Sequence, residues 1–240
     1  MKGMKFSVIA LSAALLMSSC SMSNKAKGGL IGGGGGAALG ALIGQLAGDG
    51  KGAAIGAGVG AAIGAGAGIL IGNKMDKAKE AAEQVENAQV EMMEDNNTGL
   101  KYVKVTFDSG ILFATSDATL STSAKSSLTQ FATTVLKTNP DMDVAVVGYT
   151  DNVGWKNSTA EESKNKNKTL SLQRAQSVST YLISNGATSS QIKYVEGLGE
   201  ENPVASNATK EGQAQNRRVE VYMYASQAMI DAAQQQSGGK

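Results

Sequence analysis

The side chains that most often carry chemistry are scarce in this 240-residue sequence, which contains no histidine and one cysteine, Cys20. Histidine is the commonest general base and metal ligand, so its absence removes the most frequent catalytic and metal-binding arrangements. One cysteine can form neither an intrachain disulfide nor a cysteine-based zinc site. Serine–lysine or two-carboxylate catalysis is not formally excluded. We expect a protein that is not an enzyme and that uses no metal and no cofactor.

Cys20 directly follows a segment with the pattern of a secretory signal. Two lysines precede an apolar run over residues 6–17, and two serines separate that run from the cysteine. A basic start, a short apolar run and small residues before the cut are typical of a signal peptide. The run is too short for an ordinary membrane span. We therefore expect residues 1–19 to be removed as a signal peptide.

Residues 16–20, Leu-Met-Ser-Ser-Cys, resemble the lipobox of bacterial lipoproteins, although Met17 stands where that family prefers leucine. The resemblance implies that Cys20 is the acylated first residue, at the start of a short linker over residues 20–27. Each buried acyl methylene contributes about 0.8 kcal/mol to anchoring. Because no acidic residue directly follows Cys20, the sorting rules of that family imply the outer membrane, with the C-terminal part in the periplasm. The alternative is an unmodified thiol.

Glycine occupies every fourth position from Gly32 to Gly72, eleven times in succession. Glycine destabilises a helix in water by about 1 kcal/mol relative to alanine. In lipid, where the backbone must be hydrogen-bonded internally, small residues at this spacing allow two helices to approach closely. The turn-prone residues 49–52 carry the only two charges of the segment and divide it. We expect residues 28–72 to form a membrane hairpin of two short helices, over residues 30–47 and 53–71.

Two alternatives to this hairpin stay open. The first is a flexible glycine linker, although the regular leucine, isoleucine and valine residues between the glycines are unlike the polar composition of linkers. The second is packing between copies of the chain, which would give a homo-oligomer or a pore through the glycine stripe.

Residues 73–99 are rich in alanine, glutamate, glutamine and lysine, and residues 74–95 are expected to form a helix. Apolar residues recur at heptad-like spacing, but the seam is short and alanine-rich, which makes it weak. We expect a solvated helical linker that holds the C-terminal domain away from the membrane by about 33 Å at 1.5 Å per residue.

From residue 101 the periodicity changes to that of an α/β domain. Alternating apolar residues predict strands over residues 103–107, 143–149, 192–196 and 219–223. Two amphipathic segments predict helices, one after Ser121 or Thr122 and one through residues 170–182. The order βαβαββ indicates an α+β sandwich over residues 100–226, with helices on one face of a mixed sheet. Residues 227–240 are expected to be a polar tail in the form of a frayed helix.

The motifs of this domain resemble those of the OmpA-like peptidoglycan-binding domain family, which includes flagellar-motor stators. The resemblance covers roughly residues 101–225 and, with the glycine repeat and the lipobox, implies a glycine-zipper lipoprotein of that family. The matching motifs are Gly-Tyr-Thr-Asp at 148–151, Asn167, Leu-Ser-Leu-Gln-Arg-Ala at 170–175, Gly-Leu-Gly-Glu at 197–200, Asn-Pro at 202–203 and Asn-Arg-Arg-Val-Glu at 216–220.

By position, the resemblance implies that Asp151 and Arg174 bind the diaminopimelate of the peptidoglycan stem peptide. Diaminopimelate carries an ammonium and a carboxylate at the free end of its side chain, and a carboxylate and a guanidinium can pair with both. The alternative is a structural salt bridge between Asp151 and Arg174.

Four further residues belong to the expected site. Asn167 is expected to orient or contact the ligand, and Thr150 is either a contact or a turn residue. Strand alternation sends one of Arg217 and Arg218 inward and the other outward, and it does not tell which reaches the ligand. Residues 152–168 are expected to form a long polar loop that hangs in solvent, covers the site or contacts the ligand through Trp155.

The sequence therefore predicts a protein that tethers the outer membrane to peptidoglycan. Its expected partners are the stem peptide and membrane lipid. A formal net charge of +1 and the lack of a basic domain argue against nucleic-acid binding. The alternative is a channel-forming or membrane-perturbing oligomer built on the glycine segment, with the wall domain as its anchor. A wall-cleaving enzyme is a third hypothesis, which we do not favour.

Overall fold

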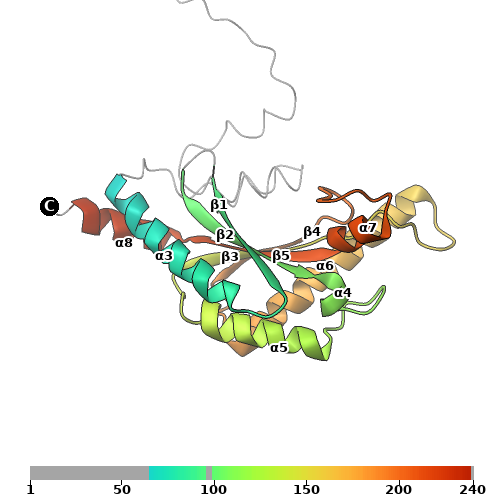
Figure 1. The fold of residues 1–240 in the computed structure, drawn as a ribbon, viewed down its shortest axis with the longest axis horizontal. Coiled ribbons are helices and arrows are strands. Elements are labelled where there is room, and N and C mark those ends of the chain that lie inside the picture. The colour runs from blue at the N-terminus through green and yellow to red at the C-terminus, as the bar shows by residue number, and fades with distance from the viewer. Residues whose placement is uncertain (1–64, 96–98, 239–240) are drawn as a thin grey trace, which may run out of the picture.

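The computed structural model describes residues 65–95 and 99–238, which form one sheet with helices packed against it (Figure 1). The elements, in chain order, are α3 (Ala65–Glu83), β1 (Ala88–Glu94), β2 (Lys101–Asp108), α4 (Ser109–Leu112), α5 (Thr122–Phe131) with its π-helical continuation η2 (Ala132–Leu136), β3 (Met142–Gly148), α6 (Ala160–Asn185), β4 (Ile192–Gly197), α7 (Lys210–Asn216), β5 (Arg218–Ala225) and α8 (Gln227–Gly238).

The five strands are arranged in the order β1-β2-β5-β3-β4. Only β3 and β4 are parallel, and the other neighbours are antiparallel. The predicted α/β class with a mixed sheet is confirmed, and the four expected strands correspond to β2, β3, β4 and β5. The helix α6 connects the two parallel strands, as a parallel pair requires.

One face of the sheet forms the main core with the helices α3, α5 and α6 (Figure 1). Apolar side chains of β2, β3 and β5 alternate onto this face, as period-2 patterning predicts. The rings of Phe107 and Phe131 meet edge to face with centroids 5.8 Å apart, which joins β2 to α5. On the other face a smaller cluster is rich in tyrosine and includes Tyr102, Tyr149 and Tyr222.

The expected helical linker differs from the structure. The helix α3 ends at Glu83, and residues 88–94 form an edge strand instead, so the prediction of helix over residues 84–95 is wrong. These residues are mostly good helix formers, but the open edge of β2 supplies ladder partners, with Val90 opposite Val105. Cross-strand pairing and packing override the local propensity.

The helix α3 is part of the domain rather than a spacer. Its heptad-like residues Met75, Ala78 and Ala82 are fully buried in the main core, so they pack on the sheet and on α8. Ala67 and Ile71, which belong to the expected hairpin, are buried in the same core. Within the described residues no helix is long and apolar enough to cross a membrane. Cys20 and residues 28–64 lie outside the described residues.

The C-terminal segment is helical, in agreement with the predicted helix, but it is docked on the domain and is not a frayed polar tail. Residues 227–238 form α8, which lies beside α3 at one end of the molecule (Figure 1). Met229, Ile230 and Ala233 are buried at helical spacing and join the main core. A three-residue apolar stripe among glutamines is enough to dock the helix because α3 offers a matching apolar face.

Substitution of Ile71 tests whether α3 belongs to the domain. Ile71 is 1% exposed and Ile69, two residues earlier on the same helix, is 65% exposed. We expect Ile71→Ala to lower the free energy of unfolding by about 2–5 kcal/mol, since it leaves a cavity. Ile69→Ala, the matched control, should change it by about 0.5 kcal/mol or less. Equal effects in chemical denaturation would show that α3 does not pack on the sheet.

Candidate functional site

The predicted site residues gather where α6 crosses the carboxyl ends of β3 and β4. A Cβ on Gly148 would lie 2.1 Å from the backbone oxygen of Ser171, and a Cβ on Gly197 would lie 2.2 Å from the backbone nitrogen of Leu172. No other residue type fits at such distances, so the two glycines let the helix backbone touch the sheet. This contact brings the side chains of α6 beside residues 149–151.

The long loop expected over residues 152–168 is short in the structure. Residues 149–159 connect β3 to α6, and only residues 152–159 of the expected loop are outside the helix, because the helix begins at Ala160. Thr159 caps it in a capping box: its hydroxyl accepts from the backbone N–H of Glu162, and the Glu162 carboxylate accepts from the backbone N–H of Thr159. This reciprocal pair satisfies two free donors at the helix start. The connection is further held by the backbone N–H of Trp155, which donates to the Ser163 hydroxyl.

Asp151 lies directly after β3 and is 8% exposed. Its Oδ2 accepts from Nη1 of Arg217 at 2.6 Å, and its Oδ1 accepts from the backbone N–H of Val153 at 3.1 Å. Arg217 is therefore the member of the arginine pair that reaches the site.

Asn167 links α6 to the segment between β3 and α6 that carries Asp151. Its Nδ2 donates to the backbone oxygens of Asp151 and Val153, at 3.5 and 3.3 Å. Its Oδ1 accepts from Nε1 of Trp155 at 2.7 Å. The predicted orienting role of Asn167 has this geometric basis: the amide fixes the backbone that carries the Asp151 carboxylate.

Arg174 reaches a loop on the other side of α6 instead of pairing with Asp151. Its Nε donates to the backbone oxygen of Asp117 at 2.9 Å, its Nη2 donates to that of Ala114 at 3.3 Å, and its guanidinium lies 5.1 Å from the centre of the Phe113 ring. Nη1 makes no hydrogen bond with the part of the chain that is described. Burial, followed by repulsion from Arg217, lowers the pKa of Arg174 below its ordinary value.

The loop that receives Arg174 is itself ordered by a carboxylate. The Asp117 Oδ1 accepts from the backbone N–H groups of Ala118 and Thr119, at 2.7 and 2.9 Å. These bonds, with that from Thr119 strongest, hold the pKa of Asp117 below its usual range. No spacing in the sequence pointed to this loop, because backbone oxygens leave no side-chain signature.

Arg218 belongs to a separate buried network. Its Nε donates to Oε1 of Glu220 at 2.7 Å, its other nitrogens donate to the backbone oxygens of Asn202 and Asn216, and its guanidinium stacks 3.7 Å from the centre of the Tyr149 ring. The Tyr222 hydroxyl donates to the other oxygen of Glu220. Arg218 thus stabilises the sheet through this network. Its geometry does not support the predicted contact with a ligand.

Thr150 and Asn216 stabilise the surrounding turns. The backbone N–H of Thr150 donates to Gly199 at 2.7 Å, and its buried hydroxyl has no hydrogen-bond partner among the described residues. The Asn216 Oδ1 accepts from the backbone N–H groups of Val204 and Ala205. Asn216 therefore shapes the loop before α7.

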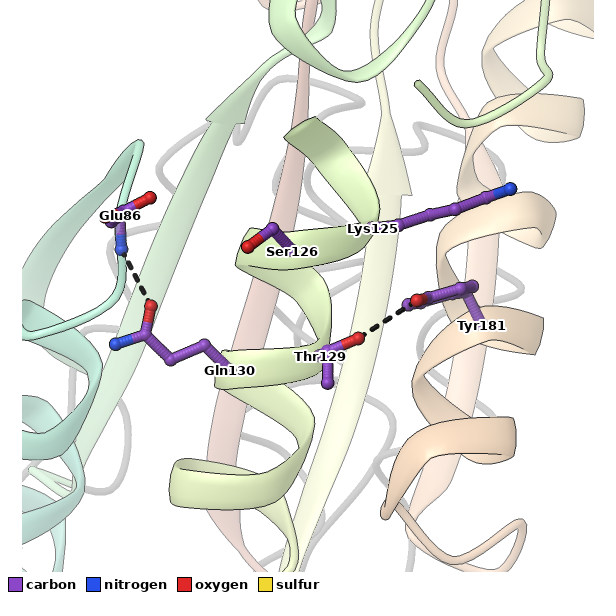
Figure 2. A pocket seen from close by; sticks show the side chains of 6 residues that line it. All are labelled: Glu86, Lys125, Ser126, Thr129, Gln130 and Tyr181. Carbon is purple, nitrogen blue, oxygen red and sulfur yellow. Dashed lines mark hydrogen bonds between the residues drawn. The ribbon is translucent and has the colours of Figure 1, made fainter. Parts of the chain in front are cut away.

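A second candidate site is a hollow of about 490 Å³, lined mainly by α5 together with Tyr181 of α6. This second hollow does not include the predicted residues. Figure 2 shows Thr129 and Tyr181 facing each other across it, while Gln130 accepts from the backbone N–H of Glu86. Its polar groups are mostly occupied with one another, so it is the weaker candidate for a ligand site.

The charges of the first site favour a ligand that carries a carboxylate. Arg217 pairs with the buried Asp151, and repulsion from Arg217 and attraction to Asp151 and Asp117 all act on the pKa of Arg174. Among the described residues no buried carboxylate makes an ion pair with Arg174, and the solvent-exposed Asp117 offsets part of its positive charge. A ligand carboxylate would balance it, and an ammonium on the same ligand would find Asp151.

The described domain is a five-stranded mixed sheet with α6 packed closely on its carboxyl edge and a charged cluster at that edge. The comparison with family models agrees: residues 112–217 match the OmpA family and residues 1–76 match the YMGG-like Gly-zipper. The C-terminal part of the chain is therefore similar to the OmpA family and its N-terminal part to the YMGG-like Gly-zipper, as the resemblance implied.

Individual relatives cover parts of the chain. The probable lipoprotein YiaD of Escherichia coli (strain K12) is 46% identical over 117 residues, which are 49% of this chain and 46% of that protein. The peptidoglycan-binding protein ArfA of Mycobacterium tuberculosis is 49% identical over 86 residues, which are 36% of this chain and 24% of that protein. The chain thus spans less than half the length of these relatives. A putative MotB like protein from Desulfovibrio vulgaris shares the fold, with a TM-score of 0.52 at 21% identity over 67% of this chain and 92% of that one.

The different roles of the two adjacent arginines can be tested by stability. Arg218→Gln leaves the buried Glu220 without its guanidinium, so we expect the free energy of unfolding to fall by about 3–5 kcal/mol. Arg217→Gln, on a side chain that is 36% exposed, should cost about 1 kcal/mol or less. Glu220→Gln added to Arg218→Gln should recover part of the loss. Equal destabilisation by the two single variants would contradict this assignment.

Proposed function

We propose that this protein is a non-catalytic outer-membrane lipoprotein that tethers the membrane to peptidoglycan by binding diaminopimelate of the stem peptide. The observation that carries the proposal is the charge cluster at the α6–β3 edge, where Arg217 pairs with the buried Asp151 while Arg174 is held by backbone oxygens and makes no ion pair with a described carboxylate. Diaminopimelate carries a carboxylate and an ammonium at one end. These two charges are complementary to the arginines and to the aspartate of this edge.

The Arg174 and Arg217 guanidinium groups would receive the ligand carboxylate. Arg174 is held in place by two backbone oxygens, so little rotamer entropy is lost when its remaining N–H groups bind. Charge-assisted hydrogen bonds of this kind contribute about 1.5–3 kcal/mol each.

The Asp151 carboxylate would receive the ligand ammonium. In the ligand-free site Arg217 already donates to it, so the ammonium must share Asp151 with that guanidinium or displace it. Displacement is compatible with the site because the released Arg217 can turn to the ligand carboxylate. Asn167 supports the exchange by holding the Asp151 backbone.

Relatives support the choice of ligand class. ArfA is described as a peptidoglycan-binding protein and YiaD as a probable lipoprotein. The lack of histidine, and the engagement of both Glu220 oxygens by Arg218 and Tyr222, support binding without catalysis. Many copies acting on one wall would gain avidity even where a single site binds weakly.

Binding to the wall can be measured with the full chain in detergent and with soluble stem peptides that end in diaminopimelate. Asp151→Asn and Arg174→Gln should each weaken peptide binding by about 10- to 100-fold, since each removes one charge-assisted pair. Purified wall sacculi should likewise retain the wild type and release both variants under dilute conditions.

Two matched controls accompany this experiment. Asp143→Asn changes an aspartate of the same strand β3 that pairs with Lys193 far from the ligand edge, and Lys125→Gln changes a cation that lines the second hollow. Both should bind like the wild type. Equal binding by Asp151→Asn, Arg174→Gln and the controls, with thermal unfolding unchanged, would refute the site.

Acylation of Cys20 is tested by metabolic labelling with a fatty-acid probe. Wild type should incorporate the label and fractionate with the outer membrane, whereas Cys20→Ala should incorporate none, because Cys20 is the only thiol in the chain. Label in the variant, or wild type without label, would remove the lipid anchor from the proposal.

A further inference from the structure

The loop over residues 114–119, between α4 and α5, holds the Arg174 guanidinium. The backbone oxygens of Ala114 and Asp117 accept from Nη2 and Nε of Arg174. The Phe113 ring, directly before the loop, has its centre 5.1 Å from the guanidinium carbon. The position of the Arg174 side chain therefore depends on the shape of this loop.

The loop has little packing of its own to maintain that shape. Residues 114–117 are exposed, and Ser116 has a φ of 56°, in the left-handed region that serine rarely adopts. One backbone hydrogen bond closes the turn, from the N–H of Asp117 to the oxygen of Ala114 at 3.2 Å. An exposed turn with a strained residue needs a further stabilising contact to keep one conformation.

The Asp117 side chain provides that contact. Its Oδ1 accepts from the backbone N–H groups of Ala118 and Thr119, which fixes the chain directly after the turn. The same carboxylate also acts on Arg174 through its charge. Burial and a neighbouring arginine lower the pKa of Arg174, and two aspartates, one of them Asp117, act in the opposite direction. Hydrogen bonding and charge from one side chain thus favour the same position of the guanidinium.

We propose that Asp117 is a positioning residue for the ligand carboxylate: it folds the loop over residues 114–119 so that the loop oxygens fix the Arg174 guanidinium at the α6–β3 edge. The inference rests on the proposed function, in which Arg174 receives that carboxylate. Without the Asp117 carboxylate the loop is free to change shape, and binding must then order the guanidinium at an entropic cost. Recognition of a carboxylate weakens, while ligand groups that Arg174 does not contact are bound as before.

The first experiment needs no ligand. The sequence contains three arginines, Arg174, Arg217 and Arg218, so the full chain in detergent with isotope-labelled arginine gives one Nε–H signal for each in nuclear magnetic resonance. The signal that Arg174→Gln removes is that of Arg174. Asp117→Ala should speed hydrogen exchange of this Nε–H about tenfold, because the bond to the loop oxygen opens more often. Asp117→Asn keeps an oxygen acceptor, so its exchange should stay within about twofold of the wild type.

The second experiment compares two stem peptides that end in diaminopimelate, one with a free side-chain carboxylate and one with a carboxamide in its place. Asp117→Ala should weaken the carboxylate peptide about tenfold and the carboxamide peptide by less than about twofold. Asp117→Asn should bind both peptides like the wild type. Added to Arg174→Gln, Asp117→Ala should cause no further loss, because the side chain that it positions is already absent.

Asp108→Ala is the matched control. Asp108 caps α4, where its Oδ1 accepts from the backbone N–H of Gly110, so this variant also removes a carboxylate that orders a turn. Within residues 65–95 and 99–238 it makes no hydrogen bond with Arg174. Both alanine variants should lower the midpoint of thermal unfolding by a few degrees. Asp108→Ala should change neither the exchange of Arg174 nor the ratio of the two peptide affinities.

Each outcome decides the proposal. Unchanged exchange in Asp117→Ala, equal weakening of the two peptides, or additive losses in the double variant overturns it. A loss in Asp117→Asn as large as in Asp117→Ala also overturns it, because the carboxylate would then act as a direct partner of the ligand ammonium. If Arg174→Gln binds both peptides like the wild type, the proposed function fails at Arg174. The exchange measurement then decides alone whether Asp117 positions this side chain.

Discussion

The close contact between α6 and the sheet is the constraint on which the rest of the binding edge depends. At Gly148 and Gly197 the helix backbone lies so near the strands that even a methyl group would clash with backbone atoms. The hydrogen bond from the backbone N–H of Gly199 to the Ser171 hydroxyl adds a polar connection at the same level. Because α6 cannot shift outward without losing these contacts, Asn167 and Arg174 have fixed positions relative to the end of β3.

This fixed geometry determines which partner each charged side chain of the cluster has. Asp151 and Arg174 do not neutralise each other directly; each is held by a different partner, Arg217 in one case and backbone oxygens in the other. Two guanidinium groups near one carboxylate are costly unless they are bound by further acceptors. Arg174 meets this requirement with the backbone oxygens of Asp117 and Ala114, and Arg217 meets it with Asp151. In the proposed function, the N–H groups of Arg174 that remain would receive the ligand carboxylate.

The parts of the fold that were predictable are those where local pattern and tertiary environment agree. Every second residue of β2, β3 and β5 is an apolar side chain in the main core, although β3 and β5 are buried on both faces, and α6 has its apolar residues on one side. The edge strand β1 was not predictable, since its Ala, Gln, Glu and Met residues favour a helix. It forms a strand only because β2 supplies hydrogen-bond partners along its open edge. The α6 start was missed because its first turns are polar. Its capping box at Thr159 and Glu162 is readable in the sequence.

The same reasoning applies to the site. Residue types and motif positions were sufficient to select Asp151, Asn167 and Arg174, but not their partners. Strand alternation alone could not assign Arg217 and Arg218, because Arg217 lies at the cap of α7, one residue before β5, where alternation does not yet hold. Arg218 is directed instead by Glu220, two residues farther along β5 on the same face.

Docking of α3 changes how such a tether would transmit force. A solvated helical spacer would let the wall domain move independently of the membrane segment. Here the glycine-repeat residues Ala67 and Ile71 are already in the core of the domain, and α8 packs beside them. The domain and the last turns of the glycine repeat therefore form one packed unit. Tension applied between wall and membrane would act across a buried apolar interface of α3, and that interface resists separation in proportion to the apolar area it buries.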